Sequence, residues 1–92
     1  MPYVPRFAKK TRAKWRSEAR SDPEAADFLK TLGGRIRTLR TKKKLSQEKA
    51  AEAAQLSPQH WVDIEHGRTN PTVTSLVGIA RALGAKVRDL FD

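Results

Sequence analysis

The side chains most able to do chemistry lie close together, between residues 57 and 66. His60 and Asp63 are three positions apart, a spacing at which two side chains on a helix could share a metal ion, and His66 beside Glu65 could serve acid–base chemistry. A metal site needs a third converging ligand and a catalytic site needs an activated nucleophile, and this open helix offers neither, in a chain without cysteine. We therefore expect that the protein is not an enzyme and holds no metal or cofactor. Residues 57–66 are instead expected to form a polar surface that binds a partner.

The composition indicates an anionic partner. The 92 residues form a single small domain and carry 19 Lys and Arg against 10 Asp and Glu, a formal net charge of +9. Such a balance attracts nucleic acid or an anionic membrane surface. The chain has no apolar run of the about 18 residues that a membrane span needs, and its first twenty residues lack the apolar centre of a signal peptide. We therefore expect an intracellular protein.

Two thirds of the net charge lies in a basic N-terminal arm. The first 20 residues have seven basic side chains and one acidic one. A block of like charge with few apolar groups favours an arm that stays disordered until it binds. A residue pattern repeating every fourth position, from Phe7 through Trp15 to Ala19, favours a short extra helix instead. We divide the chain into this arm, residues 1–21, and a domain, residues 22–92. The basic arm residues expected to contact a partner are Arg6, Lys9, Lys10, Arg12, Lys14 and Arg16.

The domain opens with a long helix. Asp22 is a capping acceptor and Pro23 suits the first helical position, so a helix is expected to start there. Its apolar face is formed by residues spaced four, four and three apart, namely Phe28, Leu32, Ile36 and Leu39. Gly33 and Gly34 interrupt the pattern. Because each glycine weakens a helix, either the helix bends or breaks at this pair, or a neighbouring backbone needs the space.

The remaining segments read as short helices, without a strand signal. Ser46 caps a second helix that runs to about Gln55, and Ser57 followed by Pro58 opens a third helix that ends at Gly67. A fourth helix is expected after Thr72 and is closed by Gly84, and a short amphipathic turn or two follows it near the C-terminus.

Two short helices joined by a turn, after a longer helix and before an apolar one, have the layout of a helix-turn-helix. A more specific likeness is carried, in chain order, by Leu32-Gly33, Ile36-Arg37, Leu39-Arg40, Leu45-Ser46-Gln47-Glu48, Ala51, Leu56-Ser57, Ile64-Glu65, Gly67, Asn70-Pro71, Leu76, Ala80 and Leu83-Gly84. In these residues the chain resembles the phage-repressor (Cro/Xre type) helix-turn-helix family over roughly residues 28–91. The resemblance implies an all-α, compact five-helix, lambda-repressor-like domain that binds operator DNA, usually as a dimer on a two-fold site.

In this resemblance the helix of residues 57–66 reads the major groove. At 100° per residue, a polar edge lies opposite the core-facing Trp61 and Ile64. The expected base-reading residues are Gln59, Asp63 and His66 on that edge, with His60 and Val62 on its flanks. Gln59 offers a donor and an acceptor to adenine, and Val62 could touch a thymine methyl. Asp63 either accepts from cytosine N4 or orients a neighbouring His or Arg, and the alternative for the whole edge is a solvated surface.

Phosphate contacts are expected on both sides of the reading helix. The N-terminal N–H groups and dipole of the second helix suit a phosphate oxygen, and the family uses the Gln47 position in this way. A run of three lysines just before that helix is either a solubilising turn or a backbone contact, and its position favours the contact. The expected phosphate-contacting residues are Ser46, Gln47, Lys42, Lys43, Lys44, Arg68 and Asn70.

Three residues are expected to be architectural. The family pairs a basic residue matching Arg40 with an acid matching Glu65, which ties the first helix to the end of the reading helix. Trp61 stands where the family usually has Ile or Leu, whereas Ala50 and Ala54 replace larger apolar residues. Because one large ring could fill two small deficits, we expect Trp61 in the core rather than stacked on DNA.

The chain departs from the family pattern at two further positions, because Lys44 and Gln55 stand where Gly is usual. These positions lie at the end of the first helix and in the helix-turn-helix turn, so the local backbone geometry is left open at both. The basic arm lies outside the resemblance.

The resemblance implies a sequence-specific transcription regulator, with a repressor as the first expectation, cytoplasmic and nucleoid-associated in a bacterial, phage or plasmid context. The alternative is an antitoxin-like subunit that binds its own promoter and holds a toxin partner with the arm. A third hypothesis is binding of the arm to RNA or a membrane; since the apolar line of the arm is thin, we expect no membrane partner.

A small core and apolar residues at the C-terminus favour a homodimer. Val87, Leu90 and Phe91 are the residues expected at its interface. The alternative is that these three side chains close the core of the monomer.

Overall fold

The computed structural model describes residues 22–91, which contain four α-helices and one 3₁₀ helix. The elements are α2 (Pro23–Lys42), α3 (Gln47–Ala54), α4 (Pro58–Glu65), α5 (Val73–Ala82) and η1 (Val87–Leu90). This part of the chain has no strand, so the all-α prediction is confirmed for it. The count of five helices is not confirmed, because the last element is a single 3₁₀ turn. The expectations for the arm concern residues 1–21, which lie outside the described residues.

Each α-helix begins at the capping residue that the sequence predicts. The Asp22 carboxylate accepts from the N–H groups of Glu24 at 2.8 Å and Ala25 at 3.2 Å. Hydroxyls do the same for the other three helices, where Ser46, Ser57 and Thr72 accept from the backbone N–H three residues later. These contacts satisfy N–H groups that have no partner within the helix, and so they fix where each helix starts.

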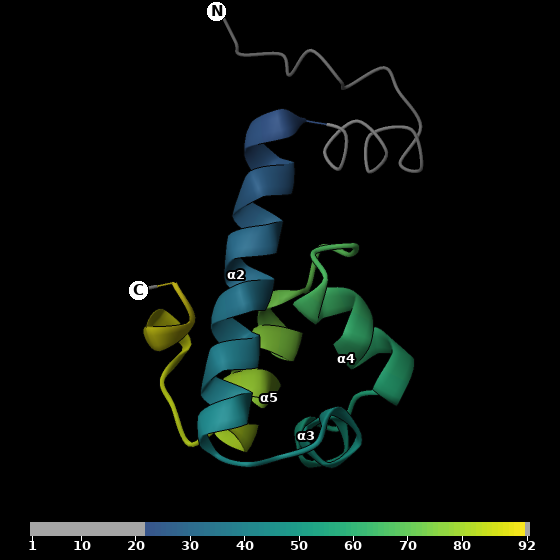
Figure 1. Cartoon of the computed structure of the whole chain (residues 1–92), viewed down its shortest axis with the longest axis vertical. Helices are drawn as coiled ribbons and strands as arrows, with labels where there is room; N and C mark the ends of the chain where they lie inside the picture. Colours follow the sequence, from purple (N-terminus) through teal and green to yellow (C-terminus); the bar gives the residue numbers. More distant parts are fainter. Residues whose placement is uncertain (1–21, 92) are drawn as a thin grey trace, which may run out of the picture.

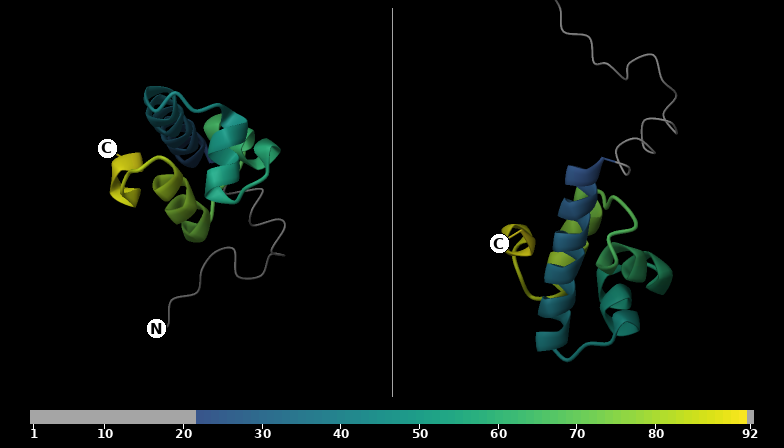
Figure 2. Two further views of the ribbon diagram at one scale, coloured as in Figure 1. Left: turned by 90° about the horizontal axis from the view of Figure 1, so that it is seen from below. Right: turned by 45° about the horizontal axis from the view of Figure 1, so that its top comes forward.

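The helices enclose one apolar core beside α2. Figures 1 and 2 show α2 as the longest element, with α3 and α4 on one side of it and η1 on the other. Trp61, Ile36, Ile79 and Leu90 are fully buried in this core, and Ala50 and Ala54 belong to the same cluster. The prediction that Trp61 is a core residue is therefore confirmed.

Helix α2 runs unbroken through both glycines. At one of them, a neighbouring backbone occupies the space that a side chain would need. A Cβ placed on Gly33 would overlap the carbonyl oxygens of Ile64 and Glu65 at the end of α4. A Cβ placed on Gly34 would meet nothing within 4 Å. Gly33 thus lets α4 approach α2 closely, whereas Gly34 faces open space.

The two non-glycine residues at family glycine positions both adopt left-handed backbone conformations. Lys44 has φ 59° after α2, and Gln55 has φ 61° at the C-cap of α3. At the second position the Leu56 N–H reaches back to the Ala51 carbonyl at 2.8 Å, which closes the helix end. The helix-turn-helix turn therefore keeps its shape although its residue is not glycine.

The C-terminal apolar residues divide between core and surface. Leu90 is fully buried and Val87 is half-buried against the core, so the expectation that Leu90 lies at a dimer interface is wrong. Residues three apart on a 3₁₀ helix lie on one side of it, which turns Val87 and Leu90 inward together. Phe91 stays 45% exposed and stacks on Phe28 of α2, with ring centroids 5.7 Å apart. Phe28, expected on the core face of its helix, is 54% exposed.

Candidate nucleic-acid interface

The helix-turn-helix unit of this chain consists of α3, the turn at residues 55–57 and α4. The two helices pack against each other, and each also packs on a different supporting helix, α3 on α5 and α4 on α2. One face of α4 is buried in this way through Trp61, Ile64 and Glu65. The opposite face is left at the surface.

The predicted reading edge of α4 lies on that surface face. On this edge Gln59 is exposed and Asp63 is half-buried. On its flanks His60 and Val62 are also half-buried. The Gln59 amide donates to the Asp63 carboxylate at 3.0 Å, and Arg68 Nε lies 3.7 Å from the same Asp63 oxygen. The Asp63 carboxylate therefore holds the Gln59 amide and faces the Arg68 guanidinium.

His66 lies at the C-cap of α4, at the end of the helix. It lines a polar recess of about 420 Å³ together with Arg37, Arg40, Gln47 and Glu65. This recess joins α2, the first residue of α3 and the end of α4. His66 and the first residue of α3 therefore line the same recess.

Glu65 is the most highly connected polar group of the recess. Arg40 donates to both of its carboxylate oxygens, from Nε at 2.6 Å and from Nη2 at 3.2 Å, so the predicted ion pair is present. The Gln47 amide donates to it at 3.0 Å, and the Trp61 indole N–H donates to it as well. Burial acts to raise the pKa of Glu65, but the hydrogen bonds from Arg40, Trp61 and Gln47 and the charge of Arg40 leave the pKa below its ordinary value.

The residues expected to contact phosphate differ in what their side chains touch. Ser46 uses its hydroxyl to cap α3, and Gln47 uses one amide N–H on Glu65. Lys43 Nζ lies close beside Gly84, just after the C-terminal end of α5. The remaining members, Lys42, Lys44, Arg68 and Asn70, are exposed.

Sequence reasoning did not select Arg37 as a site residue. Its exposed side chain lines the recess with Gln47 and His66 and also a second hollow beside Thr38, Thr41 and Lys42. The available signal was its spacing on α2, three residues before Arg40 and thus on a neighbouring part of the same helix surface. Arg37 adds a cation where α2 faces the start of α3.

Among residues 22–91, no helix combines the length and the apolar character needed to cross a bilayer.

Comparison with known proteins identifies the class of this domain. Residues 31–92 match the family described as helix-turn-helix domain. The immunity repressor protein of Bacillus phage phi105 is 44% identical over 57 residues, which are 62% of this chain and 40% of that protein. The control protein C.BamHI of Bacillus amyloliquefaciens is 36% identical over 62 residues, covering 66% of this chain and 76% of that protein.

A solved structure shows the same arrangement of helices. The restriction-modification controller protein C.AhdI from Aeromonas hydrophila superposes with a TM-score of 0.68 at 36% identity, over 72% of this chain and 98% of that one. The chain therefore belongs to the helix-turn-helix domain family, and the predicted phage-repressor (Cro/Xre) type is confirmed. It spans less than half the length of two of its relatives, the phi105 repressor at 40% and a Deinococcus deserti regulator at 45%.

Proposed function

We propose that this protein is a non-enzymatic, sequence-specific DNA-binding transcription regulator, most simply a repressor, acting in the cytoplasm on the nucleoid. The observation that carries this proposal is the polar surface edge of α4, held on a helix-turn-helix unit whose other face is buried. The relatives support it, since they are named as an immunity repressor, a transcriptional regulator and a control protein. The antitoxin-like alternative depends on residues 1–21, and no observation in the described residues favours it.

In this proposal α4 enters the major groove and its edge contacts bases. The Asp63 carboxylate holds the Gln59 amide nitrogen at 3.0 Å, which leaves the amide oxygen and the second N–H of Gln59 for the N6 and N7 atoms of adenine. Val62 faces a thymine methyl, and His60 extends the contact along the groove. His66, at the other end of the helix, contacts the DNA strand that borders the groove.

Phosphates are contacted from two sides of the reading helix. On one side the N-terminal N–H groups of α3 meet a phosphate oxygen, with Arg37, Lys42 and Lys44 as neighbouring cations. On the other side Arg68 and Asn70, in the turn after α4, contact the opposite strand. The basic arm, residues 1–21 with a net charge of +6, adds further phosphate or minor-groove contacts.

Replacing Gln59 by Ala is expected to weaken binding to the preferred operator by about 1 to 3 kcal/mol, because a bidentate base contact is lost. Binding to unrelated duplex should change little, since Gln59 touches no phosphate in this arrangement. The operator is first obtained by selecting bound duplexes from a random pool, and affinities are then measured on both duplexes by fluorescence anisotropy.

The matched control for this prediction is Arg68→Ala. Because this change removes a phosphate contact, we expect it to lower the affinity for the operator and for the unrelated duplex by the same factor. It should also reduce the steepness of the plot of log affinity against log salt by about one. If Gln59→Ala and Arg68→Ala gave the same pattern on the two duplexes, α4 would not be reading bases.

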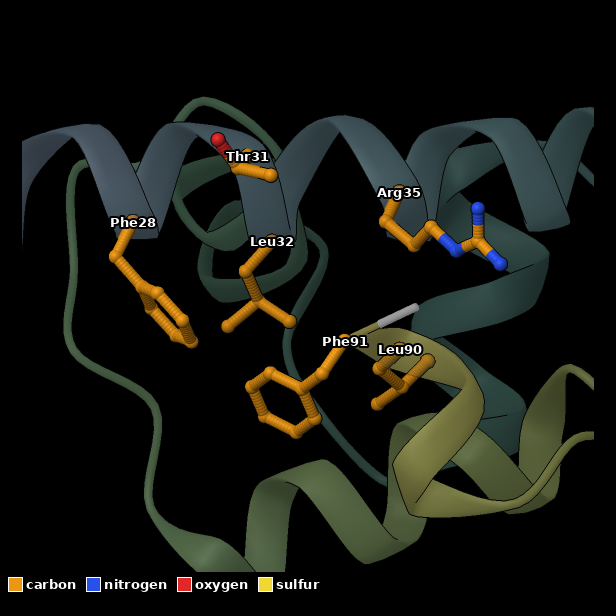
Figure 3. Close-up of a pocket in the computed structure, with 6 residues that line it drawn as sticks. All are labelled: Phe28, Thr31, Leu32, Arg35, Leu90 and Phe91. Carbon is orange, nitrogen blue, oxygen red and sulfur yellow. The ribbon is translucent and has the colours of Figure 1, made fainter.

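We further propose that the regulator is a homodimer joined beside the C-terminus. Figure 3 shows the exposed rings of Phe28 and Phe91 next to Leu32, around a groove of about 170 Å³. Arg35 Nε donates to the Asp89 carbonyl at 3.1 Å and ties η1 to α2 at the edge of this groove. Since η1 and α4 lie on opposite sides of α2 (Figure 1), two copies joined here leave both reading helices free.

Replacing Phe91 by Ser is expected to convert a dimer into a folded monomer. The change removes the exposed ring from the proposed interface and leaves the buried Leu90 in place, so the dimer dissociation constant should rise at least about tenfold. Sedimentation equilibrium measures the mass, and circular dichroism checks the fold. Val73→Ser is the control, because Val73 is an exposed apolar residue of α5, 74% accessible, outside the groove. A dimer that survived Phe91→Ser unchanged would exclude this interface.

A further inference from the structure

Trp61 contributes a polar contact as well as its volume to the core. The ring is fully buried, and its indole N–H donates to the Glu65 carboxylate one turn along α4. The Ile or Leu that the family usually has at this position carries no donor. The indole N–H therefore adds a hydrogen bond that an aliphatic side chain at this position could not make.

The four donors around Glu65 are divided between its two oxygens. One oxygen, Oε2, accepts from Trp61 Nε1 and from Arg40 Nε, and the other, Oε1, accepts from Arg40 Nη2 and from Gln47 Nε2. A carboxylate has about four lone-pair sites, so the group is fully used. A fully used carboxylate with a side chain only 2% exposed has little freedom to rotate. Its orientation sets where Oε1 points and thus where the Gln47 amide lies.

Gln47 is the residue through which this network reaches the surface. It is the first residue of α3 and is half-buried, and Arg40 Nη1 also donates to the Leu45 carbonyl two residues earlier, at 2.8 Å. An amide nitrogen carries two hydrogens, so one N–H of Gln47 is held by Glu65 and the other is available to a ligand.

We infer that Trp61 is a positioning residue for the DNA backbone: through Glu65 it holds the Gln47 amide in the orientation in which its free N–H meets a phosphate oxygen. This inference rests on the proposed function. Its physical basis is that a side chain already ordered in the free protein loses less conformational entropy on binding. The Glu65 carboxylate in this way links α4, the reading helix, to Gln47 at the start of α3.

The first test measures DNA affinity for Trp61→Phe, which keeps an aromatic ring and removes the indole N–H. We expect affinity to fall about two- to tenfold on operator and on unrelated duplex alike, since a backbone contact is affected. The control is Ile79→Val, a fully buried change on α5 that removes volume outside the network. It should lower the melting temperature while leaving the affinity within about twofold of the wild type.

The second test is a double-mutant cycle with Gln47→Ala. If Trp61 acts through Gln47, the double variant should bind no more weakly than Gln47→Ala alone. Additive losses, or a loss in Trp61→Phe that is absent in Gln47→Ala, would overturn the inference. So would an equal loss of affinity in Ile79→Val, which would make the effect one of core stability.

The third test needs no DNA and separates this inference from the proposed function. In ¹⁵N NMR spectra, Trp61→Phe should move the Gln47 side-chain amide signals toward those of a free amide, whereas Ile79→Val should leave them in place. The reciprocal variant Gln47→Ala keeps the core intact, and it should shift the Trp61 indole N–H signal while Gln59→Ala does not. Unmoved signals in both experiments would overturn the inference even if the protein binds DNA. Shifted signals without operator binding would support the Trp61–Glu65–Gln47 link and would count against the proposed function instead.

Discussion

Gly33→Ala is expected to destabilise the domain by about 3 kcal/mol, although alanine is the better helix former. The added Cβ would overlap the backbone carbonyls of Ile64 and Glu65, which have no flexible side-chain end that could move aside, so α2 and α4 must separate. For a domain of this size the melting temperature should fall by about 10 to 20 °C. Thermal and urea unfolding followed by circular dichroism measure both quantities.

The adjacent glycine supplies the control for this prediction. Gly34→Ala places the same methyl group where nothing lies within 4 Å, on the same helix. It should stabilise the domain by about 1 kcal/mol through helix propensity alone. Equal effects of the two substitutions would show that α4 does not press against α2 at Gly33.

Arg40→Met is expected to cost about 3 to 5 kcal/mol at pH 7, because it leaves the Glu65 carboxylate buried without its ionic partner. The methionine keeps the apolar stem of Arg40, so the loss reports on the charge. The side chains of Arg40 and Glu65 are 14% and 2% exposed, so water screens this pair little. Urea unfolding at a series of pH values measures the difference from the wild type.

The pH dependence of this difference has a definite sign. In the wild type the pKa of Glu65 is lowered below 4.5, so the stability that its charge contributes is present above pH 4.5 and is lost as the pH falls through the lowered pKa. In Arg40→Met burial is less offset, and the pKa of Glu65 is expected to rise. The difference in unfolding free energy should therefore shrink as the pH falls through that raised pKa. A difference independent of pH would mean that Glu65 is not the group left unpaired.

An exposed ion pair provides the control for Arg40→Met. Arg68 lies 3.7 Å from Asp63, and its side chain is 58% exposed. Such pairs contribute little to stability because water and salt screen them. Arg68→Met should therefore change the free energy of unfolding by less than about 1 kcal/mol at any of these pH values.

The helix starts could be predicted because they depend on local contacts. Asp22, Ser46, Ser57 and Thr72 each bind backbone N–H groups two or three residues away, and the sequence contains everything that decides such a contact. The alternatives at Gly33 could not be separated in this way. The backbone that needs the space belongs to α4, more than 30 residues along the chain.

The polar network at Glu65 was only partly predictable for the same reason. Its pairing with Arg40 followed from the family resemblance, and the Trp61 contact spans one helical turn and could have been noticed from spacing. The Gln47 contact joins residues 18 positions apart on different helices, so it depends on how α3 packs against α4. The sequence analysis did not predict that Val87, Leu90 and Phe91 divide between core and surface. The reason is that the last element is a 3₁₀ turn, whose period differs from that of an α-helix.

The central claim, that the surface edge of α4 enters the major groove, is tested most directly by NMR. The selected operator duplex is titrated into ¹⁵N-labelled protein, and signal changes are mapped onto the chain. Our account predicts the largest changes at Gln59, His60, Val62 and Asp63, with further changes at the start of α3. Changes confined to the Phe28–Phe91 groove or to residues 1–21, with the signals of α4 unmoved, would contradict it.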